Sequence, residues 1–123
     1  MSLELAVRKA LENPIRPRGR TSISRFASIL TDGYKTYIGL NRYKSHPLQA
    51  RFSSHPEQIY IHSEISVLSQ ALRDRVEDFS DYTLYVARVL SDGTPALAKP
   101  CPGCMSALIE FGIHNLEYTK GRQ

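Results

Sequence analysis

Hydrophobic residues recur along the chain with two alternating periods. Some segments place apolar side chains at helical spacing, and others alternate or run nearly continuously as strands do. This pattern predicts the element order α-β-β-α-β-α-β. The predicted helices cover residues 2–12, 61–76 and 102–111, and the predicted strands cover residues 23–30, 34–40, 82–90 and 114–119.

Two of these segments carry specific signals. Asp32-Gly33 separates the first two strands, and this pair supplies the positive-φ position that a hairpin turn needs. Residues 82–90 are almost uniformly apolar, which is typical of a central strand buried on both faces. Helices that alternate with strands after an initial hairpin predict an α/β fold in which helices cover both faces of a mixed sheet.

Two polar segments are predicted to be loops. Residues 41–56 contain cations, two histidines and two aromatic residues, and they lead directly to His62. Loops longer than about 12 residues in compact domains are often functional, so we expect this one near the site. Residues 15–20 contain three arginines; this basic loop either holds phosphates or is simply solvated.

Length, hydropathy and charge indicate a single domain that does not cross a membrane. The 123 residues fit one domain, residues 1–123, and no apolar stretch approaches the roughly 20 residues needed to cross a bilayer. The N-terminal segment does not resemble a signal peptide, and we expect a cytoplasmic protein without membrane association. The net charge of +4 is compatible with anionic partners such as nucleotides or nucleic acid, but many domains with other roles carry a similar charge.

Candidate chemistry gathers at the start of two predicted helices. His62-Ser63-Glu64 opens one, and Cys101 and Cys104 open the other within the segment Pro-Cys-Pro-Gly-Cys. Zinc prefers thiolate and imidazole ligands, and two cysteines three positions apart at a helix start can converge on one ion. Three ligands leave one coordination position open, as catalytic zinc sites do. A structural site would need a fourth ligand from His46, His55 or His114.

Glu64 follows His62 by two residues, so its carboxylate can approach the metal without binding it. In that place it could exchange protons with a water molecule made acidic by the metal. Neither motif is specific alone, because a lone C-x-x-C is also compatible with a redox pair or buried thiols. Their combination, with a strand between them, favours a catalytic zinc site.

The order His-x-Glu followed by Pro-Cys-x-x-Cys resembles the signature of the zinc-dependent cytidine deaminase-like superfamily. The resemblance extends over residues 21–119. It implies a three-layer α-β-α sandwich, Zn²⁺ as cofactor, and frequent self-association into homo-oligomers. Two positions differ from the usual pattern: Ser63 stands where alanine is common, and Lys99 where glutamate or serine often precedes the proline.

The resemblance also implies roles for individual residues. Glu64 would be the proton shuttle, Asn41 would contact the sugar, and the backbone N–H of Ser63 would contact the pyrimidine carbonyl. Arg42 and Lys44 are candidate phosphate contacts. The zinc ligands would be His62, Cys101 and Cys104.

The implied reaction is hydrolytic deamination of cytosine to uracil in a cytidine or deoxycytidine nucleoside or nucleotide. One alternative is cytosine in single-stranded DNA, favoured by the interleaved cations and rings of the 41–56 loop. That loop carries Arg42, Tyr43, Lys44, Arg51 and Phe52. Another base as substrate, or a zinc-binding module without turnover, are further alternatives.

Overall fold

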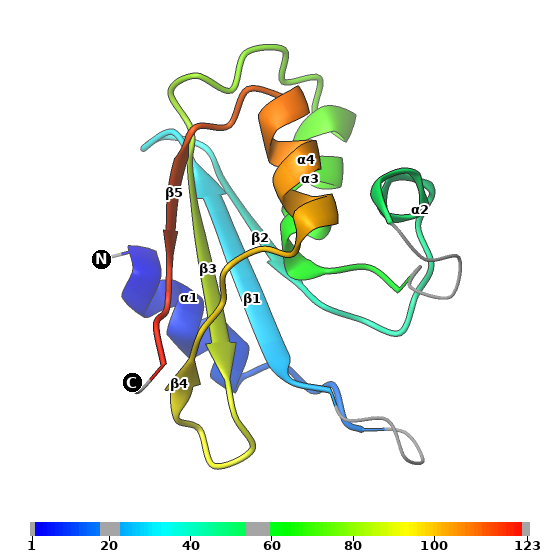
Figure 1. Ribbon diagram of the computed structural model, residues 1–123. Helices are drawn as coiled ribbons and strands as arrows, with labels where there is room; N and C mark the ends of the chain where they lie inside the picture. Colours follow the sequence, from blue (N-terminus) through cyan, green and yellow to red (C-terminus); the bar gives the residue numbers. More distant parts are fainter. Residues whose placement is uncertain (1, 18–22, 54–59, 122–123) are drawn as a thin grey trace.

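A five-stranded mixed sheet forms the centre of the fold (Figure 1). The computed structural model describes residues 2–17, 23–53 and 60–121. Strand β3 is central: β1 pairs with it antiparallel on one side, and β5 pairs with it parallel on the other. β2 lies outside β1, and the short β4 pairs with the end of β3. The strands are β1 (Arg25–Thr31), β2 (Thr36–Leu40), β3 (Thr83–Val89), β4 (Pro95–Ala96) and β5 (Asn115–Tyr118).

Helices cover the two faces of this sheet, which makes three layers. α1 (Ser2–Leu11) packs on one face through the buried side chains of Ala6 and Ala10. α3 (Ser63–Arg73) and α4 (Pro102–Glu110) lie on the other face, where the larger apolar cluster includes the fully buried Leu68 and Leu84. The predicted α/β sandwich and its mixed sheet are therefore confirmed.

The hairpin between β1 and β2 forms where Asp32-Gly33 predicts it. Gly33 has a φ of 97°, and Asp32 Oδ1 accepts hydrogen bonds from the backbone N–H groups of Tyr34 and Lys35. The turn therefore includes two residues that the sequence pattern assigns to the second strand. The pairing register then runs from Thr31 opposite Thr36 to Ala27 opposite Leu40.

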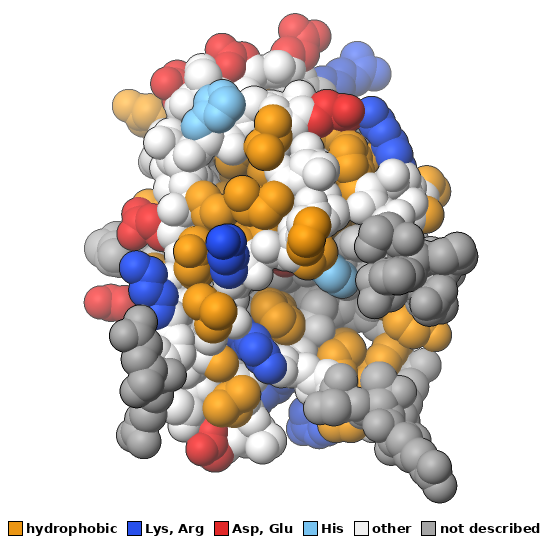
Figure 2. Space-filling model, in the orientation of Figure 1, with side chains coloured by type: hydrophobic (Ala, Val, Ile, Leu, Met, Phe, Trp, Pro, Cys, Tyr) orange, Lys and Arg blue, Asp and Glu red, His pale blue; other side chains and the backbone are white. Residues whose placement is uncertain are grey.

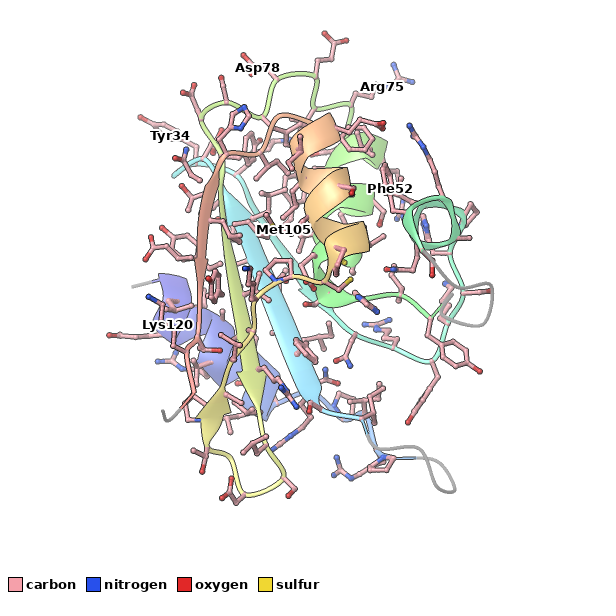
Figure 3. All side chains as sticks on the ribbon, viewed as in Figure 1. Tyr34, Phe52, Arg75, Asp78, Met105 and Lys120 are labelled. Atoms are coloured by element: carbon pink, nitrogen blue, oxygen red, sulfur yellow. The ribbon has the colours of Figure 1, made fainter. Side chains whose placement is uncertain are left out.

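The expectation of a continuous loop over residues 41–56 is wrong, because this segment contains helix α2 (Pro47–Phe52). His46 caps this helix: its Nδ1 accepts a hydrogen bond from the Leu48 N–H, and Pro47 occupies the first turn. Such a short helix is marginal in isolation. Packing against α4 stabilises helix α2, and the polar composition of the segment cannot reveal this packing. Figure 3 shows Phe52 between α2 and α4, where the Phe52 ring contacts the Phe111 ring edge-on.

Two further features bear on the predictions. β4 lies where the sequence suggests only a turn and an approach to the cysteines, and Gly93, with a φ of 87°, closes the β3–β4 turn. Of the basic loop at 15–20, only residues 15–17 lie within the described part of the chain, and they have no regular secondary structure. No helix in the described residues is long and apolar enough to cross a membrane.

Candidate metal centre and adjoining cavity

The two predicted motifs meet because each begins a helix on the same face of the sheet. His62 is the N-cap residue of α3, and Cys101 is the N-cap residue of α4. Both have extended backbones and make no side-chain capping hydrogen bond, so both side chains are available to a ligand. The positive ends of the two helix dipoles consequently face the same point, and they favour thiolates there.

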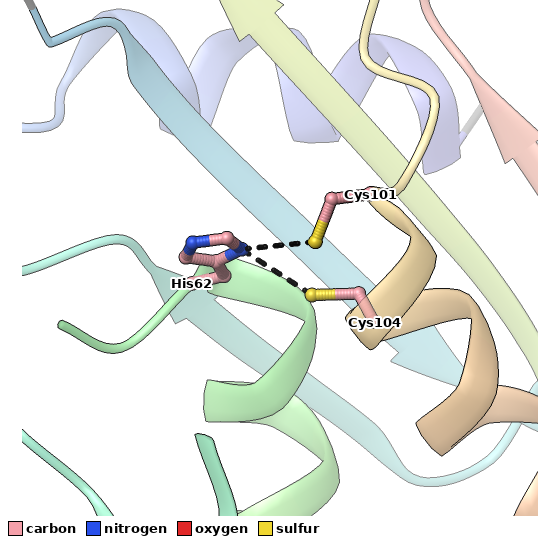
Figure 4. A group of neighbouring side chains, drawn as sticks. All are labelled: His62, Cys101 and Cys104. Atoms are coloured by element: carbon pink, nitrogen blue, oxygen red, sulfur yellow. Dashed lines mark hydrogen bonds between the residues drawn. The ribbon is translucent and has the colours of Figure 1, made fainter. Parts of the chain in front are cut away.

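Three side chains form a group that could hold a metal ion (Figure 4). The ligand atoms of His62, Cys101 and Cys104 all lie within 4.8 Å of one another. His62 Nδ1 is 3.8 Å from Cys101 Sγ and 3.3 Å from Cys104 Sγ. One imidazole and two thiols are a donor set that suits zinc, and neither cysteine is in a disulfide.

A fourth protein ligand is absent from this group among the described residues. His46 instead caps α2, and His114 is exposed at the start of β5. His55 lies outside the described residues. Three ligands leave a coordination position open, which is the arrangement of catalytic rather than structural zinc.

Contacts within this group favour one thiolate. Hydrogen bonds from Cys104 and from His62 lower the pKa of Cys101 to about 3. The same contact with Cys101, together with burial, raises the pKa of the Cys104 thiol, and the hydrogen bond to Cys101 raises the pKa of His62. The three groups thus share protons that a bound dication would displace.

Glu64 is almost fully buried, with 4% of its surface exposed, and burial raises the pKa of its carboxyl. A chain of hydroxyls holds it: Ser63 Oγ donates to Glu64 Oε1 at 3.0 Å and lies 2.8 Å from Ser28 Oγ. Because Ser63 has a single hydroxyl proton, Ser28 must donate to Ser63. A raised pKa and a fixed orientation are both properties that a general acid–base group needs.

A cavity of about 450 Å³ lies beside these groups. This volume is within the range of small-molecule sites. His62, Glu64 and Cys101 contribute its polar wall, and most of the remaining wall is apolar or aromatic. The other lining residues are Ile23, Phe26, Asn41, Arg42, Tyr60 and Ile61. The arrangement places a buried carboxylate, the metal ligands and a ring-sized space together.

Of the three side chains predicted to contact the substrate, Asn41 and Arg42 line the cavity and Lys44 does not. Asn41 lines the cavity, but its amide is engaged: Oδ1 accepts from Asn13 Nδ2 at 2.8 Å, and Nδ2 donates to the Ser24 carbonyl at 2.9 Å. Arg42 is exposed and lines the cavity. Lys44 is exposed and is not among the lining residues.

The cations and rings of residues 41–56 do not form one continuous surface. Arg51 pairs with Glu110 of α4, and its guanidinium lies 4.8 Å from the centre of the Phe52 ring. Tyr43 packs edge-on against Tyr60 at 5.6 Å. Of the cations and rings at 41–56 that the structure describes, Arg42 alone lines the cavity; Tyr60, which contacts Tyr43, lines it from the next segment.

Two residues that support the site were missed by the sequence pattern. Gln49 of α2 is buried, and its Oε1 accepts a hydrogen bond from the His62 N–H. Gly103 lies between the two cysteines, and a Cβ atom there would be 2.2 Å from the Phe52 carbonyl oxygen. A glycine inside a helix start signals such a close approach, whereas nothing local marks Gln49.

Comparisons with known proteins agree with this geometry. A family model described as the cytidine and deoxycytidylate deaminase zinc-binding region matches residues 2–120. Among solved structures, a cytidine deaminase from Burkholderia pseudomallei is similar in fold, with a TM-score of 0.63 and 18% sequence identity. The similarity covers 100% of this chain and 87% of that one. No curated protein matches the chain significantly in sequence.

Proposed function

Because the chain belongs to the family of the cytidine and deoxycytidylate deaminase zinc-binding region, we propose that it deaminates cytosine hydrolytically to uracil in a cytidine or deoxycytidine nucleoside or nucleotide. Water would supply the new carbonyl oxygen, and the exocyclic amine would leave as ammonia. One observation carries the proposal: the buried Glu64 carboxylate lines the same cavity as His62 and Cys101 but is not part of the metal-ligand group.

The cofactor is zinc, and the fit of the donor set supports His62, Cys101 and Cys104 as its ligands. Bound zinc supplies a Lewis acid that makes water a stronger acid and nucleophile. Glu64 would take the proton released from that water and return it first to the pyrimidine ring nitrogen and then to the leaving amine. The hydroxyl chain from Ser28 through Ser63 would hold the carboxylate oriented between these steps.

Substrate contacts follow from the cavity wall. Asn41 Nδ2 donates one N–H to the Ser24 carbonyl and has a second N–H, which would donate a hydrogen bond to the sugar. The backbone N–H of Ser63, in the first turn of α3, would donate to the pyrimidine carbonyl. Arg42 would contact a phosphate at the cavity, whereas the position of Lys44 supports only a longer-range electrostatic role.

Cytosine in single-stranded DNA is the second candidate substrate. The exposed Arg42 and Tyr60 favour it, because a cation beside a half-exposed ring suits a nucleotide that flanks the target base. The free thiols of the site are compatible with a reducing compartment such as the cytoplasm. Self-association stays a prediction.

The proposal is tested by incubating zinc-loaded protein with deoxycytidine, its monophosphate and a cytosine-containing single-stranded oligonucleotide, and measuring uracil. Glu64→Gln should lower kcat at least about 100-fold while zinc content is unchanged. If uracil forms only in the oligonucleotide, the substrate is single-stranded DNA and not the nucleoside or mononucleotide. Full activity of Glu64→Gln would remove the proton-shuttle assignment, and bound zinc without turnover on any substrate would indicate a non-catalytic module.

A further inference from the structure

A second cavity, of about 620 Å³, lies beside the catalytic one and is lined by three arginines. Arg16 precedes β1, Arg25 begins β1, and Arg88 is near the end of β3. No acidic residue is among the lining residues, and none of the three arginines forms an ion pair within the described part of the chain. On the face shown in Figure 2, acidic side chains gather at the upper rim, and others lie at the left edge and at the lower end of the molecule.

Arg25 and Arg88 are both fixed by hydrogen bonds, but each has N–H groups that these bonds do not use. Arg25 donates to the carbonyls of Leu11 and Leu90, and Arg88 donates from Nε to Ser24 Oγ at 3.0 Å and weakly to the Leu97 carbonyl at 3.5 Å. A guanidinium has five N–H groups, so each retains three without an acceptor among the described residues. Fixed, unneutralised guanidinium groups are well suited to phosphate, which they can bind in a bidentate manner.

Ser24 and Phe26 connect this arginine cavity to the catalytic one. The Ser24 carbonyl accepts from Asn41 Nδ2, while its hydroxyl accepts from Arg88. Phe26 lines the catalytic cavity, is the cross-strand partner of Arg88, and lies with its ring centre 5.8 Å from the Arg88 guanidinium carbon. Ile23 lines both cavities.

We propose that the arginine cavity, rather than Arg42, is the main phosphate subsite for the substrate, with Arg88 as its principal ligand and Arg25 and Arg16 adding positive charge. The proposal rests on the proposed function, because Asn41 would hold the sugar and Ser24 joins Asn41 to Arg88. A phosphate attached to that sugar would thus be near the guanidinium. The substrate class is then a phosphate-bearing cytosine compound, either a mononucleotide or a unit of a polynucleotide, rather than the nucleoside.

The test compares kcat/KM for deoxycytidine, deoxycytidine monophosphate and a short single-stranded oligonucleotide in wild type, Arg88→Gln and Arg88→Lys. Arg73→Gln is the matched control, since Arg73 is exposed at the C-terminal end of α3. We expect Arg88→Gln to reduce the ratio of phosphate-bearing to nucleoside kcat/KM about tenfold or more, and Arg88→Lys to reduce it less. A reduced ratio with the monophosphate identifies a mononucleotide site, and one confined to the oligonucleotide identifies a polynucleotide site.

Equal losses on all three substrates would show that Arg88 acts only through packing on Phe26, and would overturn the proposal, as would an unchanged ratio. Titration with inorganic phosphate by calorimetry separates this proposal from the deaminase assignment. If no substrate yields uracil but Arg88→Gln weakens phosphate binding and Arg73→Gln does not, the phosphate subsite survives and the reaction assignment fails. Unchanged phosphate binding in Arg88→Gln would overturn the subsite.

Discussion

The side chain of Gln49 accepts a hydrogen bond from the backbone N–H of His62, with 3.0 Å between Gln49 Oε1 and the His62 nitrogen. This contact joins α2 to the first residue of the candidate zinc site. The His62 N–H precedes α3 and has no partner within that helix, so the buried amide of Gln49 satisfies a donor that the helix cannot.

Replacing Gln49 by methionine should weaken zinc binding and lower stability without leaving a cavity in the core. The side chain keeps its length but loses the acceptor, and an unsatisfied buried N–H costs about 1–3 kcal/mol. We expect a lower free energy of unfolding and weaker zinc binding, measured by urea denaturation and by competition with a chelator. Gln70→Met is the control, because the Gln70 side chain also bonds a backbone group, donating from Nε2 to the Ile38 carbonyl, but away from the site. Equal effects of the two variants would contradict a specific role for Gln49.

Gly103→Ala should separate α2 from α4. The new Cβ atom would meet the Phe52 carbonyl oxygen at 2.2 Å, so one helix must shift. Such overpacking costs about 1–3 kcal/mol, and the shift would misplace the two cysteines that flank Gly103. Thermal denaturation and zinc content measure both effects. Ser106→Ala, at an exposed position on α4, should change neither. A fully stable, zinc-replete Gly103→Ala protein would show that the close approach does not exist.

Zinc should stabilise the folded chain and its removal should destabilise it. A ligand that binds only the folded state adds about 2.7 kcal/mol at one hundred times its Kd. Addition of a chelator should therefore lower Tm, and added zinc should restore it. In Cys101→Ser this response should be largely lost, because one of the three ligands of the group is gone. A zinc-dependent shift as large in Cys101→Ser as in wild type would exclude Cys101 as a ligand.

An exposed cluster away from the site makes stability sensitive to alkaline pH. Asp74 Oδ2 accepts hydrogen bonds from Tyr37 Oη at 2.6 Å and from Lys35 Nζ at 2.7 Å, which joins β2 to the end of α3. The hydrogen bond to Asp74 raises the pKa of Tyr37 from 10.0 to about 12. A pKa raised in the folded state contributes stability that is complete below the unfolded pKa and is lost as pH rises through the folded pKa.

The urea midpoint of wild type should therefore exceed that of Tyr37→Phe at pH 9, and the difference should shrink as pH rises from about 10 to 12. Asp74→Asn should lower the pKa of Tyr37 in a spectrophotometric titration. The exposed Tyr34 makes Tyr34→Phe a control whose effect on the urea midpoint should not depend on the bond to Asp74. A pH-independent difference between wild type and Tyr37→Phe would contradict the cluster.

Local chemistry determined much of this protein. The Asp32-Gly33 turn, the apolar run of β3 and the helical spacing of α3 each depend on neighbouring residues, so the pattern predicts them closely. The His-x-Glu and Pro-Cys-x-x-Cys motifs predict a metal group because ligand type and helix start are both local properties. The structure brings His62, Cys101 and Cys104 together as that chemistry requires.

Tertiary structure alone decided the rest, because those features join residues far apart in the chain. Helix α2 depends on packing against α4. The role of Gln49 becomes clear only in the folded chain, where its side-chain amide accepts a hydrogen bond from the His62 N–H. Composition cannot distinguish Arg42, which lines the cavity beside Glu64, from Arg51, which pairs with Glu110. Arg88 reads in sequence as an ordinary strand residue. Only the antiparallel pairing that sets it opposite Phe26 places its charge beside the cavity.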